Sequence, residues 1–564
     1  MKNSLTIVLS GEAGQGLQTI EGFLVEAIAK SYYVFSTKEV MSRVRGGNNT
    51  LEIRVSDESV YAYQHTIDML FLLNDHSFSR LTKRITEKTI IFGEEGFADQ
   101  SVIEEKKATF QPFNLGELSK QAGGALFANT LLFGFVSGML NLDEDSCKNQ
   151  IMNRFERRGE KLVSDNKAAF DMGYTRGREY PIQKNINKST KTSTYKMSDG
   201  TTAVGIGAIA GGCNFVAAYP MSPGTGVLTY LARKSNAFEI LVEQAEDEIA
   251  ALNMVIGAWY AGARGLTTTS GGGFALMEEA VSLSGINETP CVIHVAQRPG
   301  PGTGLPTRTE QADLNLVVYA GHGEFPRIVF APGKLEDAVQ LTQKAFYLAD
   351  KYQVPVFILT DQFFLESLGQ MEYIELDEKY LESFITKTDV DYKRYLLTQE
   401  GLSPRGIPGY GDGLVKVDSD EHDEAGGITE DFDVRILMND KRLKKRELLL
   451  EEYSDAELIG PSDYKNLVVG WGSTYGVLSE FVETSGTSDT AFLYIKQVFP
   501  IHEYLKAYFN KAKKVIVVEN NATGQFANLL KLELDVKIDH KILKYNGEPF
   551  SIEEVEKRLK EVLL

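Results

Sequence analysis

A single glutamate near the start of a predicted helix is the strongest candidate for chemistry in this chain. Residues from about Glu246 to Tyr260 carry apolar side chains at i, i+3, i+4 and i+7 spacing, which predicts a helix with a buried face. Glu248 would point along that face, where a carboxylate needs a cation, a base or a hydrogen-bond donor opposite it. Acidic residues also favour helix starts because of the helix dipole, and we prefer that interpretation for Glu243, Glu246 and Asp247.

A serine and an arginine follow two other predicted strands. Ser222 stands between two prolines in the turn after the apolar run 215–219, and Arg298 ends the apolar run 292–297. In a parallel α/β sheet, ligands gather at the carboxyl ends of the strands, so we expect the two side chains to meet there. A hydroxyl and a guanidinium together suit a carboxylate, since arginine binds both of its oxygens. The alternative is a turn serine and a surface arginine.

A glycine loop completes the pattern. The β-rich run 265–269 leads into Ser270-Gly-Gly-Gly273, which opens the next helix. Strand, loop and preceding glutamate together resemble the pyrimidine-binding domain of thiamine-diphosphate enzymes. In those enzymes the helix glutamate hydrogen-bonds N1′ of the cofactor and favours the imino tautomer that makes the ylid. The resemblance implies that Glu248, Ser270 and Gly271 contact the cofactor.

Longer segments narrow the resemblance to one family. Tyr219-Pro-Met-Ser-Pro223 is similar to the Tyr-Pro-Ile-Thr-Pro turn in the alpha subunits of the 2-oxoacid:ferredoxin oxidoreductases, with Ser222 in place of the threonine. The runs 244–251 and 298–314 resemble the two-subunit branch that includes the 2-oxoglutarate enzymes. The resemblance covers nearly the whole chain.

That resemblance implies an activity and its site residues. The expected reaction is coenzyme A-dependent oxidative decarboxylation of a 2-oxoacid, first of all 2-oxoglutarate to succinyl-CoA, with electrons passing to ferredoxin. Glu248 would activate the cofactor, while Ser222 and Arg298 would orient the substrate's 1-carboxylate. Arg308 would bind the second carboxylate of a dicarboxylate. Pyruvate or a branched 2-oxoacid stays open as the substrate, and so does a non-catalytic scaffolding subunit.

The sequence contains no convincing motif for the half of the expected thiamine site that binds the diphosphate. Gly411-Asp-Gly413, followed by Asn439, imitates the motif that holds Mg²⁺ on the diphosphate, but the residues between are acid-rich and lack a helical period. We interpret this region, including His422, as solvated connecting structure; a self-sufficient thiamine decarboxylase is the alternative. The resemblance then implies that thiamine diphosphate is shared with a beta subunit that carries Mg²⁺ and a [4Fe–4S] cluster, in an (alpha–beta)2 complex.

Composition and cysteine usage exclude other classes. The net charge of −19 argues against binding to nucleic acid or an anionic membrane. Cys147, Cys213 and Cys291 are far apart, so we expect neither an iron–sulfur centre nor zinc in this chain. The longest apolar run, Ala125–Leu140, is short for a membrane span and predicts a buried helix. The first residues enter a strand and not a signal peptide, so we expect a cytoplasmic enzyme.

The predicted fold class is α/β with several domains. Strands that alternate with helices predict a parallel sheet in the pyrimidine-binding domain. The first expected division is residues 1–178, which resemble the gamma domain of the family, often a separate protein; we call it the gamma-type domain. The others are a polar linker (179–198), the pyrimidine-binding domain (199–376), a connecting region (377–461) and a domain like the C-terminal one of transketolase (462–564).

The gamma-type domain begins with a strand, a glycine loop (11–16) and a helix, a unit that could cradle a phosphate at the helix N-terminus. The order of the glycines differs from the dinucleotide fingerprint, which disfavours NAD. In the family this domain sits near the coenzyme A end of the active site, so contact with coenzyme A through Gly14, Gly16, Arg43 or Arg45 is a hypothesis. A glycine turn that only permits close helix–strand packing is the alternative.

Overall fold

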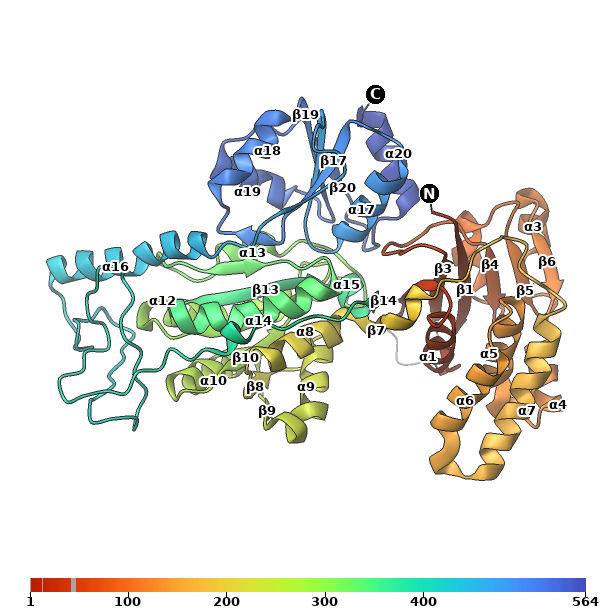
Figure 1. The fold of residues 1–564 in the computed structure, drawn as a ribbon, viewed down its shortest axis with the longest axis horizontal. Coiled ribbons are helices and arrows are strands. Elements are labelled where there is room, and N and C mark those ends of the chain that lie inside the picture. Colours follow the sequence, from red (N-terminus) through yellow and green to blue (C-terminus); the bar gives the residue numbers. More distant parts are fainter. Residues whose placement is uncertain (1, 13, 42–46, 564) are drawn as a thin grey trace. The chain divides into compact units, whose positions relative to one another are not determined.

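The computed structural model describes residues 2–12, 14–41 and 47–563 (Figure 1). It divides the chain into two compact units. The first contains the chain up to Ser198 together with Ser367–Tyr373 and Ser551–Lys557. The second contains Asp199–Glu366, Ile374–Phe550 and the residues from Arg558 on. The segment 179–198, expected as a linker, is thus part of the first unit and carries a short strand of its sheet.

An eight-stranded mixed sheet forms the centre of the first unit, in the order β6-β5-β4-β1-β3-β2-β14-β7. β1 pairs in parallel with β4 and antiparallel with β3. The strands are β1 (Ser4–Glu12), β2 (Tyr33–Glu39), β3 (Asn48–Ser56), β4 (Met69–Leu72), β5 (Ile90–Gly93), β6 (Thr109–Pro112), β7 (Lys196–Asp199) and β14 (Leu368–Met371).

The helices of the first unit include the buried helix that the sequence predicts between Ala125 and Leu140. α5 packs against α1, where Phe23 and Phe133 stack with ring centroids 5.0 Å apart. Among the described residues, no single helix is long and apolar enough to cross a membrane; α4 and α5 together pass that test of length and composition, with a 112° bend between them. The helices are α1 (Leu17–Ile28), α2 (Phe78–Leu81), α3 (Gln100–Lys106), α4 (Leu115–Gln121), α5 (Ala128–Met139), α6 (Glu144–Phe155) and α7 (Glu160–Gly177).

Four glycines set the distance between α5 and α7, which run side by side in Figure 1. A Cβ added at Gly134 or Gly138 would lie 2.2 Å from a carbonyl oxygen of α7. A Cβ added at Gly173 or Gly177 would lie 2.0 Å from a carbonyl oxygen of α5. The two backbones are therefore in contact, and a larger residue at any of the four positions would force the helices apart.

The second unit contains the parallel sheet that the sequence predicts, in the order β18-β12-β13-β11-β10-β8-β9. Five of its strands coincide with predicted ones; β9 and β18 are edge strands that the sequence analysis did not predict. β18 is antiparallel to β12. The strands are β8 (Phe215–Ala218), β9 (Leu241–Gln244), β10 (Gly265–Thr269), β11 (Cys291–Gln297), β12 (Ile328–Phe330), β13 (Pro355–Asp361) and β18 (Gln497–Phe499).

A polar row crosses the centre of this sheet. His294 on β11 lies between Thr268 of β10 and Thr360 of β13, with 2.8 Å between each hydroxyl oxygen and a ring nitrogen. Burial lowers the pKa of His294 to about 3, so the ring is neutral at physiological pH. The helices around the sheet are α8 (Gly200–Ala210), α9 (Thr225–Phe238), α10 (Glu248–Tyr260), α11 (Gly271–Phe274), α12 (Glu278–Asn287), α13 (Leu314–Val318), α14 (Leu335–Tyr352) and α15 (Gln362–Glu366).

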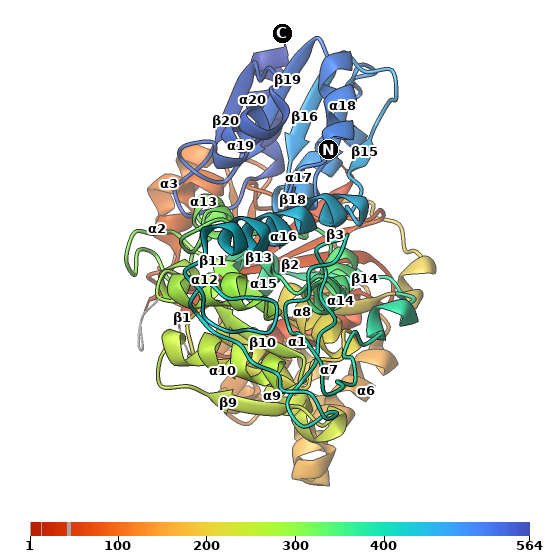
Figure 2. The same ribbon diagram turned by 90° about the vertical axis from the view of Figure 1, so that its left-hand side faces the viewer.

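The connecting region is less irregular than the sequence suggests. It ends in the long helix α16 (Phe432–Glu451), which lies near α12 (Figures 1 and 2). Two lysines of α16, Lys441 and Lys445, form ion pairs with Glu288, which follows α12 and is 1% exposed. Burial opposes the charge on Glu288, but the two ammonium groups hold the pKa of its carboxyl below the usual range.

His422 does not lie in solvent, and the sequence-based interpretation is wrong on this point. Its side chain is fully buried and stacks on Tyr395 with ring centroids 3.7 Å apart. Burial lowers its pKa. The stacking lies within the connecting region, and the Tyr395 hydroxyl donates a hydrogen bond of 3.2 Å to the Asn287 carbonyl at the end of α12.

A five-stranded sheet follows, in the order β15-β17-β16-β19-β20, parallel except for β15. Two of its strands, β16 and β19, begin at Asn466 and Lys514. The elements are β15 (Glu457–Ile459), β16 (Asn466–Gly470), α17 (Thr474–Thr484), β17 (Thr490–Tyr494), α18 (Lys506–Lys511), β19 (Lys514–Glu519), α19 (Gln525–Leu534), β20 (His540–Leu543) and α20 (Ile552–Leu563).

Two glycine-to-alanine substitutions, one at the contact between α5 and α7 and one in α1, should change stability in opposite directions. Gly173→Ala places a methyl 2.0 Å from the Leu131 carbonyl oxygen, and such overpacking costs about 1–3 kcal/mol or more. Gly22→Ala in α1 meets no atom within 4 Å and should stabilise the helix by about 0.5–1 kcal/mol. Thermal unfolding of the two variants checks this, and equal midpoints would contradict it.

Candidate functional site

Glu248 is the first residue of α10. Asp247 caps the helix, since its carboxylate accepts a hydrogen bond of 2.8 Å from the Ala250 N–H. The cap directs Glu248 inward, where its side chain is 4% exposed. Its Oε1 atom is buried and has no hydrogen-bond partner among the described residues. The carboxylate therefore has the burial that the sequence predicts, and one oxygen is left for a group from outside the chain.

The glycine loop after β10 lies directly against this carboxylate. A Cβ added at Gly273 would lie 2.6 Å from Glu248 Oε1 and 2.2 Å from Thr269 Oγ1, so only glycine fits. Ser270 is fully buried, and its hydroxyl also lacks a hydrogen-bond partner in the part of the chain that the structure describes. Glu248 and the loop that contains Ser270 and Gly271 are thus brought together as expected, with two unsatisfied polar atoms.

Ser222 and Arg298 meet at the carboxyl ends of β8 and β11. The contact runs through the backbone of the turn: Arg298 Nη1 donates a hydrogen bond of 2.7 Å to the carbonyl oxygen of Ser222. Burial lowers the pKa of Arg298, and Asp313 opposes that shift. The structure thus places a half-buried guanidinium beside the turn, while the Ser222 side chain stays exposed.

Asp313 lies in the same candidate site, against the loop that contains Gly271. It was not predicted from the sequence as a site residue. Within the run 298–314, only Arg298 and Arg308 were predicted from the sequence as site residues. The Asp313 carboxyl lies so close to Gly271 that a Cβ there would be 2.3–2.5 Å from its atoms. Burial raises the pKa of Asp313 to about 6, Glu310 adds to the rise, and Arg298 opposes it. The sequence signal that could have identified Asp313 is an acidic residue in a Pro/Gly-rich loop that follows a strand.

The C-terminal sheet holds the loop that carries Asp313. The Gln311 side chain donates to the Trp471 carbonyl at 2.9 Å and accepts from the Asn520 N–H at 3.0 Å. The Gln311 N–H donates to the Asn520 carbonyl at 2.7 Å, and the Asn521 amide donates to the Gln311 carbonyl at 3.0 Å. The loop 518–525 therefore packs against the loop that carries Asp313.

Arg308 lies on the preceding stretch of the loop. Its neighbour Thr309 donates a hydrogen bond of 3.1 Å to Asp361, at the end of β13, and Ser473 donates to the same carboxylate. Arg308 is half-buried and packs beside Gly547, where a Cβ would lie 3.2 Å from Arg308 Cβ. The backbone on both sides of Arg308 is thus fixed.

The Gly411-Asp-Gly413 segment does not form a diphosphate motif. A Cβ on either glycine would lie within 2.2 Å of a carbonyl oxygen of Thr388 or Asp389, so the glycines serve backbone packing. Asn439 lies inside helix α16 and not at the end of a strand. The strand–helix–strand arrangement that the motif requires is therefore not formed by these residues.

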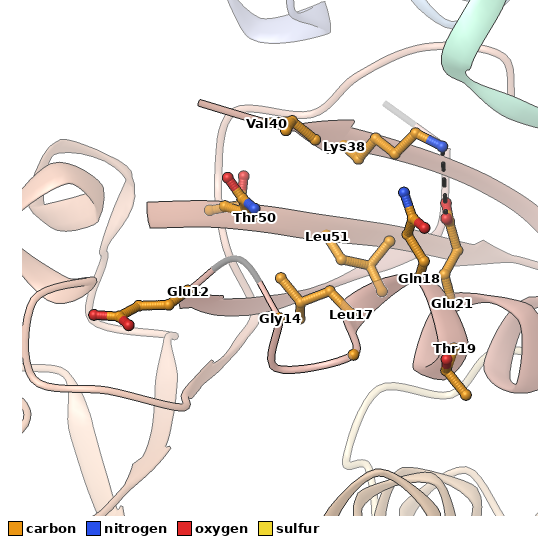
Figure 3. A pocket seen from close by; sticks show the side chains of 12 residues that line it. Glu12, Gly14, Leu17, Gln18, Thr19, Glu21, Lys38, Val40, Thr50 and Leu51 are labelled. Atoms are coloured by element: carbon orange, nitrogen blue, oxygen red, sulfur yellow. Dashed lines mark ion pairs between the residues drawn. The ribbon is translucent and has the colours of Figure 1, made fainter. Parts of the chain in front are cut away.

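A cavity of about 380 Å³ opens at the glycine loop of the first unit (Figure 3). Gly14 and Gly16 adopt positive φ angles of 95° and 79° there. A Cβ at Gly16 would lie 2.0 Å from the Asn129 amide, which agrees with the packing interpretation. Lys38 points toward Glu21, with 3.8 Å between charged atoms (Figure 3). Arg43 and Arg45 lie outside the described residues.

Two family models match the chain. One, described as pyruvate flavodoxin/ferredoxin oxidoreductase, thiamine diphosphate-binding, matches residues 206–441. The other, described as pyruvate ferredoxin/flavodoxin oxidoreductase, matches residues 6–176. The first match includes Glu248 and the glycine loop after β10. The second match includes the residues that line the cavity of the first unit.

Full-length relatives agree with these matches. The 2-oxoacid:ferredoxin oxidoreductase subunit alpha of Sulfolobus sp. is 30% identical, with 99% of this chain and 97% of the relative covered. The 2-oxoglutarate oxidoreductase subunit KorA of Mycobacterium tuberculosis is 25% identical, with 98% and 90% covered. A solved 2-oxoglutarate:ferredoxin oxidoreductase from Magnetococcus marinus, with 2-oxoglutarate, coenzyme A and succinyl-CoA bound, has a TM-score of 0.93 at 30% identity and full coverage of both chains. The chain therefore belongs to the alpha subunits of the 2-oxoacid:ferredoxin oxidoreductases.

Proposed function

We propose that this oxidoreductase subunit acts on 2-oxoglutarate, oxidising and decarboxylating it to succinyl-CoA with ferredoxin as the electron acceptor. The observation that carries the proposal is the buried, unsatisfied carboxylate oxygen of Glu248 beside the glycine loop. Leaving such a group unpaired costs about 1–3 kcal/mol of stability, which a purely scaffolding subunit has no reason to retain. Pyruvate or a branched 2-oxoacid is the alternative substrate.

The unsatisfied atoms fit thiamine diphosphate. Glu248 would hold a proton between its carboxylate and N1′ of the cofactor's aminopyrimidine, in a site from which the loop containing Ser270 and Gly271 excludes water. When bound, the cofactor supplies an electron sink for the decarboxylation. The residues that hold its diphosphate, with Mg²⁺, belong in this proposal to a beta subunit, because the Gly411-Asp-Gly413 segment does not form the motif.

The proposal gives the beta subunit the electron-transfer centre as well. Cys147, Cys213 and Cys291 are buried on separate elements, and a cluster is ordinarily bound by several cysteines close together. The complex would be an (alpha–beta)2 assembly in the cytoplasm that reduces ferredoxin through a [4Fe–4S] cluster on the beta subunit.

The substrate's carboxylates would meet two arginines. Arg298, at the carboxyl end of β11, would bind the 1-carboxylate beside Ser222, since a guanidinium can bind both carboxylate oxygens. Arg308, on the fixed loop after it, would bind the second carboxylate. Relatives named as 2-oxoglutarate enzymes support the choice of a dicarboxylate.

Coenzyme A would contact the glycine-loop cavity of the first unit through Gly14, Gly16 and Arg43. Gly14 has a positive φ, and an added Cβ there would meet nothing within 4 Å, so packing does not account for this glycine. Coenzyme A is bound in the related solved structure. The packing contact of Gly16 with Asn129 favours Gly14 as the closer of the two glycines to the ligand.

Reduction of methyl viologen tests the proposed reaction. The chain, alone and with its beta subunit, is supplied anaerobically with thiamine diphosphate, Mg²⁺, coenzyme A and one 2-oxoacid at a time. We expect activity only in the pair, and the highest kcat/KM with 2-oxoglutarate. Higher kcat/KM with pyruvate would change the substrate, and no activity of a cluster-loaded pair with any 2-oxoacid would overturn the proposal.

Glu248→Gln should abolish turnover without preventing assembly. The amide keeps the size of the side chain but cannot hold the proton, and acid–base groups of this kind contribute about 100-fold or more to rate. Glu246→Gln, at an exposed position two residues away, is the matched control and should retain activity. Size-exclusion chromatography checks assembly. A Gln variant with normal kcat would remove the cofactor role from Glu248.

Arg308→Ala should raise KM for 2-oxoglutarate more than KM for pyruvate. Loss of a charge-assisted hydrogen bond costs about 1.5–3 kcal/mol, which corresponds to about tenfold or more in affinity. Arg308→Lys keeps the charge and should show a smaller loss. Equal effects on the two substrates would mean that Arg308 only shapes the loop.

A further inference from the structure

Asp313 is a half-buried acid that the proposed reaction does not use. Its Oδ2 atom is buried and has no hydrogen-bond partner within residues 2–12, 14–41 and 47–563. Its carboxyl lies against Gly271, at the loop that covers Glu248. An unsatisfied carboxylate of this kind destabilises a protein, so its presence beside the site calls for a role in ligand binding.

The backbone of the loop is held on both sides of Asp313. The Asp313 N–H donates to the Gln297 side chain at 3.0 Å. On the two sides of Asp313, the Gln525 amide donates to the Ala312 carbonyl at 2.7 Å, and its oxygen accepts from the Asn315 N–H at 2.9 Å. Gln311 is held by hydrogen bonds to Trp471, Asn520 and Asn521. Asp313 is therefore fixed at the backbone from both directions.

The charges that face Asp313 come from two places. Arg298, at the end of β11, attracts its negative form, and Glu310, in the same loop, repels it. The groups from the other elements packed around it are uncharged: Ser270 and Gly271 at the start of α11, Gln297 of β11 and Gln525 of α19. Arg298 is thus the nearby positive charge that favours the ionised form of Asp313, without forming an ion pair with it in the described residues.

A substrate carboxylate at Arg298 competes for the same cation. Two carboxylates near one guanidinium repel each other, and the weaker acid then takes a proton. We propose that Asp313 takes up one proton from solvent when the substrate's carboxylate binds beside Arg298. The inference rests on the proposed function, because it assigns Arg298 to the 1-carboxylate.

Proton uptake makes substrate binding depend on pH. Below about pH 6, Asp313 already carries its proton, and Arg298 is available to the substrate. Above that pH, each binding event must first protonate Asp313, so KM rises by up to tenfold per pH unit, since one proton is taken up. The kcat value is not changed by this step, because the proton is in place once substrate is bound.

Calorimetry of glutarate binding to the complete alpha–beta complex measures the proton directly. Glutarate has the carboxylates of the substrate but no 2-oxo group, so it cannot react. Titrations at pH 7 in phosphate and in Tris, which differ in ionisation enthalpy, give the number of protons taken up. We expect a value approaching one for the wild type and none for Asp313→Asn. Glu310→Gln is the control and should keep the uptake.

Steady-state kinetics supply a second readout. KM for 2-oxoglutarate should rise by about tenfold or more from pH 6 to pH 8 in the wild type and in Glu310→Gln, because uptake of nearly one proton changes it by close to tenfold per pH unit above pH 6, and it should stay flat in Asp313→Asn. No uptake and a flat KM in an active wild type would overturn the inference and leave the proposed function intact. Loss of uptake in Glu310→Gln would also overturn it. A wild-type complex inactive on every 2-oxoacid would overturn the proposed function itself.

Thermal unfolding separates this role from a structural one. The pKa of Asp313 is raised in the folded state to about 6, so its stabilising contribution, present at low pH, is lost as pH rises through that value. Asp313→Asn should therefore melt higher than the wild type at pH 8, with the difference shrinking as the pH falls and disappearing below about pH 4, near the ordinary pKa of the carboxyl in the unfolded chain. A variant that melts lower than the wild type at pH 8 would mean that the carboxylate serves the fold, and would contradict the inference.

Discussion

The burial of one carboxylate oxygen without a partner is the constraint on which the site depends. Glu248 is carried inward by a helix whose cap is its neighbour Asp247, and the glycine loop lies on it so closely that Gly273 admits no side chain. In the proposed function this cost has a use, because a dry carboxylate can hold a proton on a cofactor nitrogen, which a hydrated one does poorly. The sheet beneath is correspondingly rigid, with His294 bonded to a threonine on each side.

A second constraint is the attachment of the arginine-bearing loop to the C-terminal sheet. Gln311 and the backbone around Asp313 are bonded to residues 471–525, while Thr309 is bonded to Asp361 at the end of β13. The C-terminal sheet thus helps to hold the backbone of the loop that carries Asp313. Catalytic geometry here is set by loops that a distant part of the chain holds in place.

Much of this fold could be predicted from the sequence, and the failures have physical reasons. The central strands are apolar because both faces of a parallel sheet are buried, so they stand out. β9 is an edge strand with mostly exposed side chains, so it does not stand out in the sequence. α16 buries lysines against Glu288 in place of apolar residues, so its period is hidden. Glu248 was recognisable from its local pattern, whereas the position of Asp313 depends on contacts with residues about 200 positions later.

The central claim is that this chain supplies half of a thiamine-diphosphate site, the half built around Glu248. Equilibrium dialysis of thiamine diphosphate with Mg²⁺ tests it most directly, using the chain alone, the beta subunit alone and the assembled pair. The account predicts tight binding by the pair and weak or no binding by either subunit. Binding by this chain alone, as tight as that of the pair, would contradict the account and point to a complete site within the chain.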